Sequence, residues 1–375
     1  MSAGKNRKPR SRAVSAARGG AATESEPQVR ARRSSRAPVR LRDVARYAGV
    51  STASVSRAIN SPDLVSVELR DRVTRAAQVL NWVPNGAAKA LASLHSKTIG
   101  ALIPTLGHLN FAVLIESLQH ELAKAGYTLI LGCVESSFEL RVQQARKMVE
   151  RGIDFLVIVG EAQPAQLLEL VKLQKIPVVY TYTSGRNPAN TCIGFDNYAA
   201  AARVTRHLLD LGHRKFGMIA SSSVSNDRIQ QRVAGVKDTL AEAGLGIKPQ
   251  HFAEIDSSRR IASGRAALRD VLRDAGDRPT AIVCSNDYIA TGALIEAAAL
   301  GVAVPGDLSV AGFDDVDLSA HLSPPLTTIR VPARAMGEEI ARYVINALAK
   351  GSAPLPHPLE AELVVRESTA PPKRR

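Results

Sequence analysis

Apolar and polar positions follow two different patterns along the chain, and the change between them falls near residue 98. Between residues 41 and 80 the apolar positions recur with the spacing of an α-helix. After residue 98, short runs that are apolar throughout, such as TIGALI, DFLVIV and TAIVCS, alternate with longer stretches of helical period. The first pattern predicts a small helical unit, and the second predicts an α/β unit with buried parallel strands.

The helical unit is predicted to contain three short helices. The first buries a face at positions i, i+3, i+4 and i+7, formed by Leu41, Val44, Ala45 and Ala48. Gly49 then ends this helix with a left-handed cap, while Ser51 and Ser66 are placed to cap the second and third helices. The inner faces of those two helices are Val55, Ala58 and Ile59, and Leu69, Val73, Ala76 and Leu80. Two short helices joined by a tight turn and closed by a third predict a helix-turn-helix unit.

The outer face of the second helix is small and polar. It comprises Thr52, Ala53, Ser54, Ser56 and Arg57. Such a face fits a DNA major groove, and the Arg57 guanidinium can donate to a guanine edge. The alternative is that Arg57 is an ordinary surface arginine.

The stretch VPNGAAKALASLHSKTIG, residues 83–100, begins like a helix but cannot continue as one. Pro84 and Asn85 precede an Ala-rich run that is interrupted at Ser93, and an isolated helix of about two turns is unstable in water. Leu91 is the one large apolar side chain among the alanines of this run. Taken by itself, Leu91 would more often be a minor packing contact.

These segments together resemble a known DNA-binding unit. LRDVARYAGVSTASVSRAIN, followed by VSVELRDRVTRAAQVLNWVPNGAAKALAS, is similar to the headpiece of the LacI-GalR family of bacterial transcription regulators, and the similarity extends from about residue 40 to 367. The resemblance implies that residues 85–92 form a hinge that becomes helical when two subunits bind operator DNA. It assigns DNA contacts to Asn85 and Ala88, and to Leu91 as a wedge in the minor groove, where an apolar side chain can unstack a base step.

About 270 residues of alternating strand and helix are too many for one sheet. We therefore expect two doubly wound lobes with parallel sheets, similar to periplasmic sugar-binding proteins, behind an all-α helix-turn-helix headpiece. Ligands of such sheets bind beyond the carboxyl ends of the strands. The polar residues that follow predicted strands are Thr105, Glu161, Tyr182, Ser221 to Ser223, Asn286, Asp314 and Asp315. These hydroxyl, amide and carboxylate groups suit a polyhydroxylated ligand.

The family resemblance assigns effector contacts more narrowly. Arg232 in QQRVAGV and Asp314 in GFDD match effector-clamping positions, and Asn286 and Phe111 match weaker ones. Arg232 as a surface arginine and Phe111 as a core residue are the alternatives. Two neighbouring acids are expected to be structural: Asp287 as a helix cap, and Asp315 as a loop or capping acid. Members of the family carry an aromatic residue that stacks on the ligand ring, and at the matching place this chain has SSRR, residues 257–260. Two arginines there fit an anionic effector such as a sugar acid or phosphosugar.

The net charge of +14 is concentrated at one end of the chain. Residues 1–97 contain 19 Lys and Arg against 6 Asp and Glu, whereas the other 278 residues contain 30 against 29. A basic segment joined to a nearly neutral body indicates a polyanionic partner, and it favours a nucleic acid over a membrane surface. Because no apolar run approaches the roughly 20 residues of a membrane span and the start lacks a secretory signal, we expect a cytoplasmic protein. The three cysteines are expected to be reduced core residues.

Catalytic motifs are lacking. The sequence has no P-loop, no G-x-S-x-G elbow and no metal-spaced histidine pair, so we expect neither an enzyme nor a cofactor or metal. Three other functions fit the sequence less well. A periplasmic binding protein would carry a signal peptide and would lack the DNA-binding headpiece. A sugar-processing enzyme would need catalytic groups, and a DNA-architectural protein would not need the large body.

The expected domains are a disordered basic tail (1–39), a helix-turn-helix domain (40–84), a hinge helix and linker (85–97), a two-lobed effector-binding and dimerisation domain (98–367) and a C-terminal tail (368–375). Such a chain is expected to be a repressor of a carbohydrate or sugar-acid operon, controlled by a sugar, sugar acid or phosphosugar. In the family that the chain resembles, members that form tetramers carry a leucine heptad after the α/β body. The terminal sequence ELVVRESTAPPKRR has no such heptad, so the resemblance implies a homodimer on a pseudo-palindromic operator.

Overall fold

The computed structural model describes residues 39–373, except 87–89, 91–94, 136, 186, 223, 225, 257–259 and 355–357. The chain divides into two units, Met1–Pro84 and Asn85–Arg375. We call the described part of the first unit the headpiece and the second unit the core. Of the residues predicted to contact DNA, Ala88 and Leu91 lie outside the described residues.

The headpiece consists of the three predicted helices. They are α1 (Leu41–Ala48), α2 (Thr52–Asn60) and α3 (Val67–Val79), with a 3-10 turn, η1 (Pro62–Leu64), between the last two. Gly49 adopts a left-handed conformation with φ 64° after α1. The Ser51 and Ser66 hydroxyls accept from the main-chain N–H groups of Ser54 and Leu69. The predicted caps are therefore confirmed, and they fix where α2 and α3 begin.

A small apolar core holds the headpiece together. Val44, Val55 and Val73, one from each helix, are almost completely buried against one another. Arg72 on α3 adds a polar tie, because its Nη2 donates to the carbonyl of Ala48 at 2.6 Å, directly before the turn into α2. This bond supports the orientation of α2 relative to α1.

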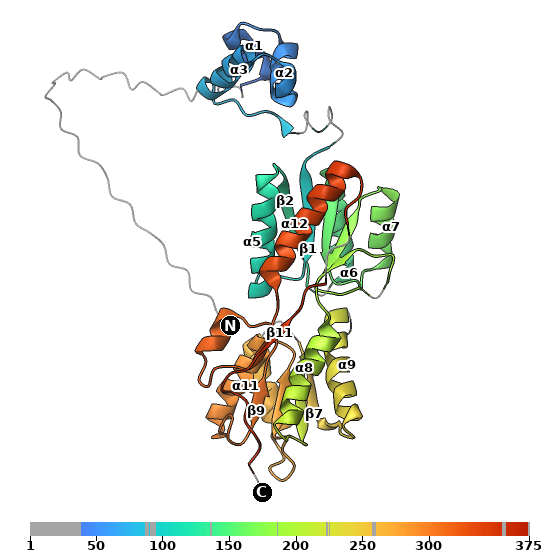
Figure 1. Ribbon diagram of the computed structural model, residues 1–375, viewed down its shortest axis with the longest axis vertical. Helices are drawn as coiled ribbons and strands as arrows, with labels where there is room; N and C mark the ends of the chain where they lie inside the picture. The colour runs from blue at the N-terminus through green and yellow to red at the C-terminus, as the bar shows by residue number, and fades with distance from the viewer. Residues whose placement is uncertain are drawn as a thin grey trace, which may run out of the picture. The chain divides into compact units, whose positions relative to one another are not determined.

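The core contains two parallel sheets, one in each of two lobes (Figure 1). Lobe 1 has strand order β2-β1-β3-β4-β5. Its strands are β1 (Thr98–Ile103), β2 (Thr128–Cys133), β3 (Phe155–Val159), β4 (Val178–Thr181) and β5 (Cys192–Ile193). Its helices are α5 (Leu109–Lys124), α6 (Phe138–Glu150), α7 (Ala165–Leu173) and α12 (Ala333–Lys350). All five residues of β3 are buried, as expected for a strand covered on both faces.

Lobe 2 has strand order β7-β6-β8-β9. Its strands are β6 (Phe216–Ser221), β7 (Ile247–Ile255), β8 (Ala281–Cys284) and β9 (Ser309–Ala311). Its helices are α8 (Asn197–Asp210), α9 (Asp227–Glu242), α10 (Arg260–Val271) and α11 (Asp287–Ala299), with the 3-10 segment η3 (Asp317–His321). The predicted pair of doubly wound lobes is therefore confirmed.

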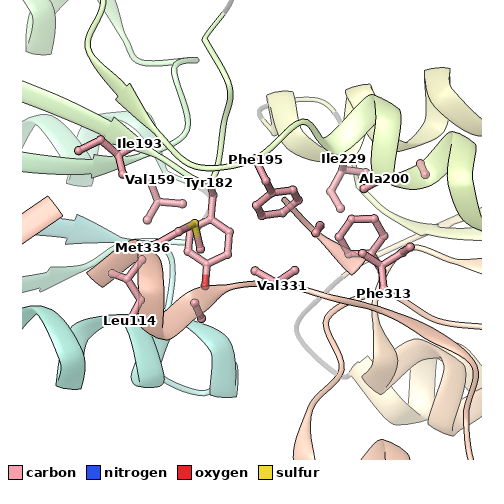
Figure 2. Close-up of a cluster of buried hydrophobic side chains, with 14 of the residues drawn as sticks. Leu114, Val159, Tyr182, Ile193, Phe195, Ala200, Ile229, Phe313, Val331 and Met336 are labelled. Carbon is pink, nitrogen blue, oxygen red and sulfur yellow. The ribbon is translucent and has the colours of Figure 1, made fainter. Parts of the chain in front are cut away.

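The chain passes between the lobes more than once (Figure 1). It leaves lobe 1 after β5 and returns to it through β10 (Thr328–Arg330) into α12, and β10 pairs antiparallel with β11 (Glu362–Val364). Aromatic residues pack where these segments cross: the rings of Phe195 and Phe313 stack with centroids 6.1 Å apart, and Tyr182 lies 6.2 Å from Phe195 (Figure 2). One apolar cluster consequently continues from lobe 1 into lobe 2.

Two sequence-based expectations are corrected by the core. Cys284 is buried, but Cys192 is only partly buried and Cys133, the last residue of edge strand β2, is exposed, so not all three cysteines lie in the hydrophobic interior. Ser368, assigned to the C-terminal tail, is fully buried, and its hydroxyl donates to the carbonyl of Val310 at 2.6 Å. The beginning of that predicted tail is therefore packed in lobe 2.

Candidate DNA-reading face and effector pocket

The predicted DNA-reading residues lie on one side of α2. Thr52, Ala53 and Arg57 are exposed, and Ser54 and Ser56 are half-buried. Ser54 Oγ lies 2.9 Å from Ser51 Oγ, so this hydroxyl takes part in the cap. The exposed side chain of Arg57 makes no hydrogen bond or ion pair within the described part of the headpiece, so its guanidinium is available to an external partner. Asn85, the first residue of the predicted hinge, is exposed.

A pocket lies between the two lobes, beyond the carboxyl ends of the strands. All four residues predicted to contact an effector, Phe111, Arg232, Asn286 and Asp314, line it. Thr105 and Tyr182, which follow β1 and β4, and Ser221, the last residue of β6, line it as well. Glu161 and Asp315 are not among the lining residues. Thus the topology brings together side chains that are far apart in the sequence.

Arg232 is buried in this pocket and is not a surface arginine. Its Nε donates to Asn197 Oδ1 at 2.9 Å, and its Nη1 donates to the carbonyl of Ser285 at 2.7 Å. The guanidinium carbon lies 3.6 Å from the ring centroid of Phe313, a cation–π contact. Burial lowers the pKa of Arg232 to about 10, although the nearby carboxylate of Asp314 opposes this shift. Arg232 remains a cation at neutral pH, held in one orientation.

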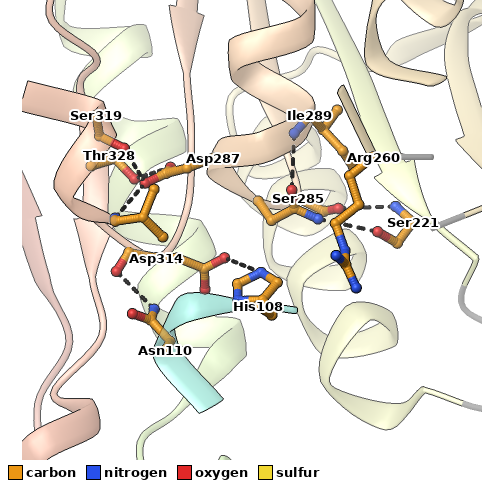
Figure 3. A network of polar contacts seen from close by, with 12 residues as sticks. His108, Asn110, Ser221, Arg260, Ser285, Asp287, Ile289, Asp314, Ser319 and Thr328 are labelled. Atoms are coloured by element: carbon orange, nitrogen blue, oxygen red, sulfur yellow. Dashed lines mark hydrogen bonds and ion pairs between the residues drawn. The ribbon is translucent and has the colours of Figure 1, made fainter. Parts of the chain in front are cut away.

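Asp314 connects the two lobes. One carboxylate oxygen lies 3.8 Å from Arg232 Nη1, and the other lies 3.0 Å from Nε2 of His108 at the start of α5 (Figure 3). The contact with His108 has ion-pair distance but not the alignment of a hydrogen bond, so this oxygen is without a hydrogen-bond partner among the described residues. The Asp314 carbonyl accepts from Asn110 Nδ2 at 2.9 Å. Asp314 has φ 124°, a strained conformation for a residue with a side chain.

Asn286, and not Asp287, caps α11, and Asn286 also lines the pocket as the sequence predicted. Asn286 Oδ1 accepts from the main-chain N–H of Ile289 at 2.9 Å, so Asn286 caps α11, while its Nδ2 donates to Ser221 Oγ at 3.3 Å. Asp287 does not cap the helix. It is buried and accepts from the main-chain N–H of Val316 and from the hydroxyls of Ser319 and Thr328. The expectation of a capping aspartate was wrong because partners far along the chain reach its carboxylate.

Two aromatic residues form the wall of the pocket in lobe 1. The rings of Phe111 and Tyr182 meet edge to face with centroids 4.8 Å apart. Phe111 packs against the apolar cluster and also lines the pocket. It therefore has features of both alternatives, a residue of the hydrophobic interior and a residue placed to contact an effector. Tyr182 is buried with φ 60°, and its hydroxyl has no hydrogen-bond partner within the described residues. Burial raises its pKa well above the usual value, so the hydroxyl stays protonated.

Two family models match the chain. The model described as bacterial regulatory proteins, lacI family, covers residues 40–85, and the model described as a periplasmic binding protein-like domain covers residues 205–369. The HTH-type transcriptional repressor PurR of Photobacterium profundum is 31% identical over 334 residues, which are 88% of this chain and 98% of that repressor.

The chain belongs to the LacI family. It is accordingly a DNA-binding transcriptional repressor. The ribose operon repressor of Haemophilus influenzae is 31% identical over 80% of this chain and 88% of that protein.

Solved LacI-family structures share the fold. The lac repressor dimer bound to operator and the anti-inducer ONPF has a TM-score of 0.78 at 29% identity, and covers 89% of this chain and 99% of that one. The CelR–cellobiose complex has a TM-score of 0.64 at 26% identity, and covers 88% of this chain and 99% of that one.

Sequence reasoning missed three charged residues that line this LacI-family pocket, His108, Arg141 and Arg228. Arg260, the last residue of the SSRR stretch that the sequence analysis singled out, lines it as well. Arg260 Nη1 donates to the carbonyl of Gly107 in lobe 1 at 3.2 Å. Arg228 precedes Arg232 by one helical turn, a spacing that places both on one face of α9 and could have identified it. For His108 and Arg141 the sequence holds no comparable signal.

Two further features of the described residues bear on function. No helix among them is long and apolar enough to cross a bilayer. No group of three or more His, Cys, Asp or Glu side chains in the same part of the chain is arranged to hold a metal ion.

Proposed function

We propose that this LacI-family repressor controls a carbohydrate or sugar-acid utilisation operon, and that a sugar, sugar acid or phosphosugar in the interlobe pocket sets its affinity for operator DNA. The convergence of Arg232, Asp314 and Asn286 on one pocket is the observation that carries this proposal. A guanidinium fork, a carboxylate and an amide offer both donors and acceptors, as ring hydroxyls require. The ribose operon repressor and the CelR–cellobiose complex among the relatives support a carbohydrate.

Reading of the operator is assigned to the headpiece and hinge. In this proposal the outer face of α2 enters the major groove and the hinge enters the minor groove. The residues concerned are Thr52, Ala53, Ser54, Ser56 and Arg57, with Asn85, Ala88 and Leu91 in the hinge. The exposed Arg57, without a partner in the headpiece, supports this assignment. The basic residues before 40 would add contacts to DNA phosphates that do not depend on sequence.

Control of DNA binding requires contacts that differ between two arrangements of the lobes, because a ligand shifts an equilibrium only by its difference in affinity for the two states. Asp314 in lobe 2 contacts His108 and Asn110 in lobe 1. A ligand that touches Arg232 and Asp314 therefore acts where the lobes meet. We propose that this is how occupancy of the pocket reaches the hinge.

The proposal is tested in two steps with the full-length protein. Selection from random DNA should yield a pseudo-palindromic site, and light scattering at micromolar concentration should give a dimer, because a two-fold protein requires a two-fold site. Thermal-shift screening of sugars, sugar acids and sugar phosphates, followed by operator titration, should then identify a compound that changes operator affinity. A monomer, or a core that no such compound affects, would contradict the proposal.

A further inference from the structure

Two arginines reach the interlobe pocket from opposite lobes without an acidic partner. Arg141 is on α6 in lobe 1 and is 8% exposed, and Arg228 is in the first turn of α9 in lobe 2. The Nη1 atom of Arg228 is buried and has no hydrogen-bond partner among the described residues. Neither guanidinium has a carboxylate oxygen within 4.0 Å in that part of the chain. By contrast, Arg232 has Asp314 and Arg260 has Glu135.

The groups that do accept from these arginines are neutral. Arg141 Nη1 donates to Gln163 Oε1 at 3.1 Å and reaches the carbonyl of Ala162 at 3.5 Å, and its Nη2 reaches the main-chain carbonyl of Glu135 at 3.5 Å. Arg228 Nε donates to Asn226 Oδ1 at 3.1 Å. The buried Arg141 and the half-buried Arg228 therefore lack a neutralising contact, an arrangement that costs free energy unless an anion is supplied.

The two arginines border the same loop, between β3 and α7. Ala162 in this loop contacts both sides. Its carbonyl accepts from Arg141 Nη1, and its main-chain N–H donates to Oδ2 of Asp227, the residue directly before Arg228. On the other side of this loop, a side chain at Gly160 would place its Cβ 3.3 Å from Arg228 Nη1. The glycine thus leaves room for the Arg228 guanidinium beside the loop that Arg141 contacts.

Asp227 does not neutralise Arg228 by direct contact. Its Oδ2 accepts from the main-chain N–H groups of Glu161 at 2.7 Å and Ala162 at 3.2 Å, and its Oδ1 accepts from that of Arg228 at 3.0 Å. The carboxylate is satisfied by main-chain donors at the start of α9, where the helix dipole also favours it. Burial lowers the pKa of both Arg141 and Arg228, and the charge of Arg228 lowers that of Arg141 further, while the charge of Asp227 opposes the shift in both. Like charges that face one pocket repel each other.

We infer that Arg141 and Arg228 form an anion subsite that takes the carboxylate or phosphate group of the effector. This inference rests on the proposed function, since it concerns the pocket assigned there to the effector. Each guanidinium offers a planar fork that matches two oxygens of such a group. Arg232 and Asp314 are left for the hydroxyls. Because one arginine belongs to each lobe, an anion between them binds the lobes to each other and favours the closed arrangement.

The test measures thermal melting of the full-length protein at constant ionic strength. The probes are inorganic phosphate, glucuronate and glucose 6-phosphate, with glucose and potassium chloride as the neutral and ionic controls. Inorganic phosphate at roughly five times its dissociation constant should raise Tm by ~2–4 °C over chloride, because ligand binding to the folded state alone stabilises it in proportion to the logarithm of that ratio. Glucuronate against glucose 6-phosphate then separates a carboxylate from a phosphate effector.

Variants assign the effect to the two arginines. Arg141→Gln and Arg228→Gln should each abolish the rise in Tm with phosphate, and Arg228→Lys should retain part of it. Arg273→Gln is the matched control, because Arg273 is an exposed arginine of lobe 2 that pairs with Asp270 on its own segment. It should keep the full rise. In chloride alone, Arg228→Gln should melt above the wild-type protein, since it removes an unpaired buried charge, whereas loss of a purely structural arginine would lower Tm.

Two results would overturn the subsite: a wild-type protein that phosphate stabilises no more than chloride does, or an Arg228→Gln variant that keeps the phosphate response. Operator binding of the wild-type protein, measured on the same samples, separates the two proposals. If the protein binds operator but anions do not raise its Tm, only the anion subsite is contradicted. If anions raise its Tm but it binds no operator, the proposed function is contradicted.

Discussion

Asp287 carries its carboxylate in an almost solvent-free position, surrounded by donors from Val316, Ser319 and Thr328. Burial raises its pKa to about 6 from the usual 3.8, more than the three donors lower it, and the charge of Asp314 adds to the rise. Between these two pH values the folded protein binds more protons than the unfolded chain. The free energy of unfolding should therefore fall as pH increases from about 4 to 6, by on the order of 3 kcal/mol from this group.

Asp287→Asn tests this account. The variant removes the titrating group, so the decrease in stability between pH 4 and 6 should largely disappear. Because an amide N–H₂ would face groups that already donate, we also expect a loss of roughly 1–3 kcal/mol at pH 4. Urea unfolding at several pH values measures both effects. A variant with the wild-type pH slope would show that the slope arises from other groups.

Arg57 gives a second prediction at the scale of one residue. Arg57→Ala should cost about 1–3 kcal/mol in binding to the selected operator and little in binding to random DNA, because a bidentate contact to a guanine edge carries sequence information. Arg57 is exposed and has no partner in the headpiece, so the unfolding of the headpiece serves as the control. Equal losses on both DNA sequences would show that Arg57 contacts phosphate.

At the scale of elements, local patterns were sufficient for most of the fold and insufficient for the pocket. The helix caps at Gly49, Ser51 and Ser66 depend on neighbouring residues, and for this reason the sequence predicted them. The contact of Asn110 with Asp314 joins residues 204 apart in the chain, and no local periodicity encodes it. The same reason explains Asp287: both Asn and Asp can cap a helix, and only tertiary donors distinguish them.

The hinge is the element whose prediction depends most on its partner. If residues 85–92 become helical on operator DNA, Leu91→Ala should reduce both the operator affinity and the DNA bend, because a smaller side chain unstacks the central base step less. Gel-shift assays with operators that carry the site at different positions measure the bend. Asp317→Ala, an exposed change in lobe 2 away from the hinge, is a suitable control. An unchanged bend in the Leu91 variant would contradict the wedge.

The distribution of charge belongs to the scale of the whole molecule. Most of the net charge of +14 lies in residues 1–97, and much of that precedes the first helix. Deletion of residues 1–36 should weaken binding to operator and random DNA alike and make both less dependent on salt, because each lost phosphate contact reduces the number of released counterions. Affinities measured at several salt concentrations give the slope. A deletion that weakens only operator binding would mean that the tail reads sequence.

Coupling between pocket and operator is the property that requires the entire chain. Arg232 Nη1 lies 3.8 Å from Asp314 Oδ1, and Asp314 also contacts His108 and Asn110 in the opposite lobe. Loss of either side chain leaves the polar groups of the ligand unpaired in a buried pocket, at about 1–3 kcal/mol for each neutral group. Arg232→Ala and Asp314→Ala should therefore lose the response of operator binding to the effector.

The direction of that loss distinguishes two kinds of effector. If the effector is an inducer, both variants should stay on operator at concentrations that release the wild-type protein. If it is a corepressor, both should fail to bind at concentrations that saturate the wild-type protein. Asp315→Asn is the matched control, because Asp315 is adjacent to Asp314 but pairs with Arg330 and Arg366 outside the pocket. Melting curves confirm that each variant is folded. A full effector response in both pocket variants, measured by operator titration, would place the effector elsewhere in the molecule.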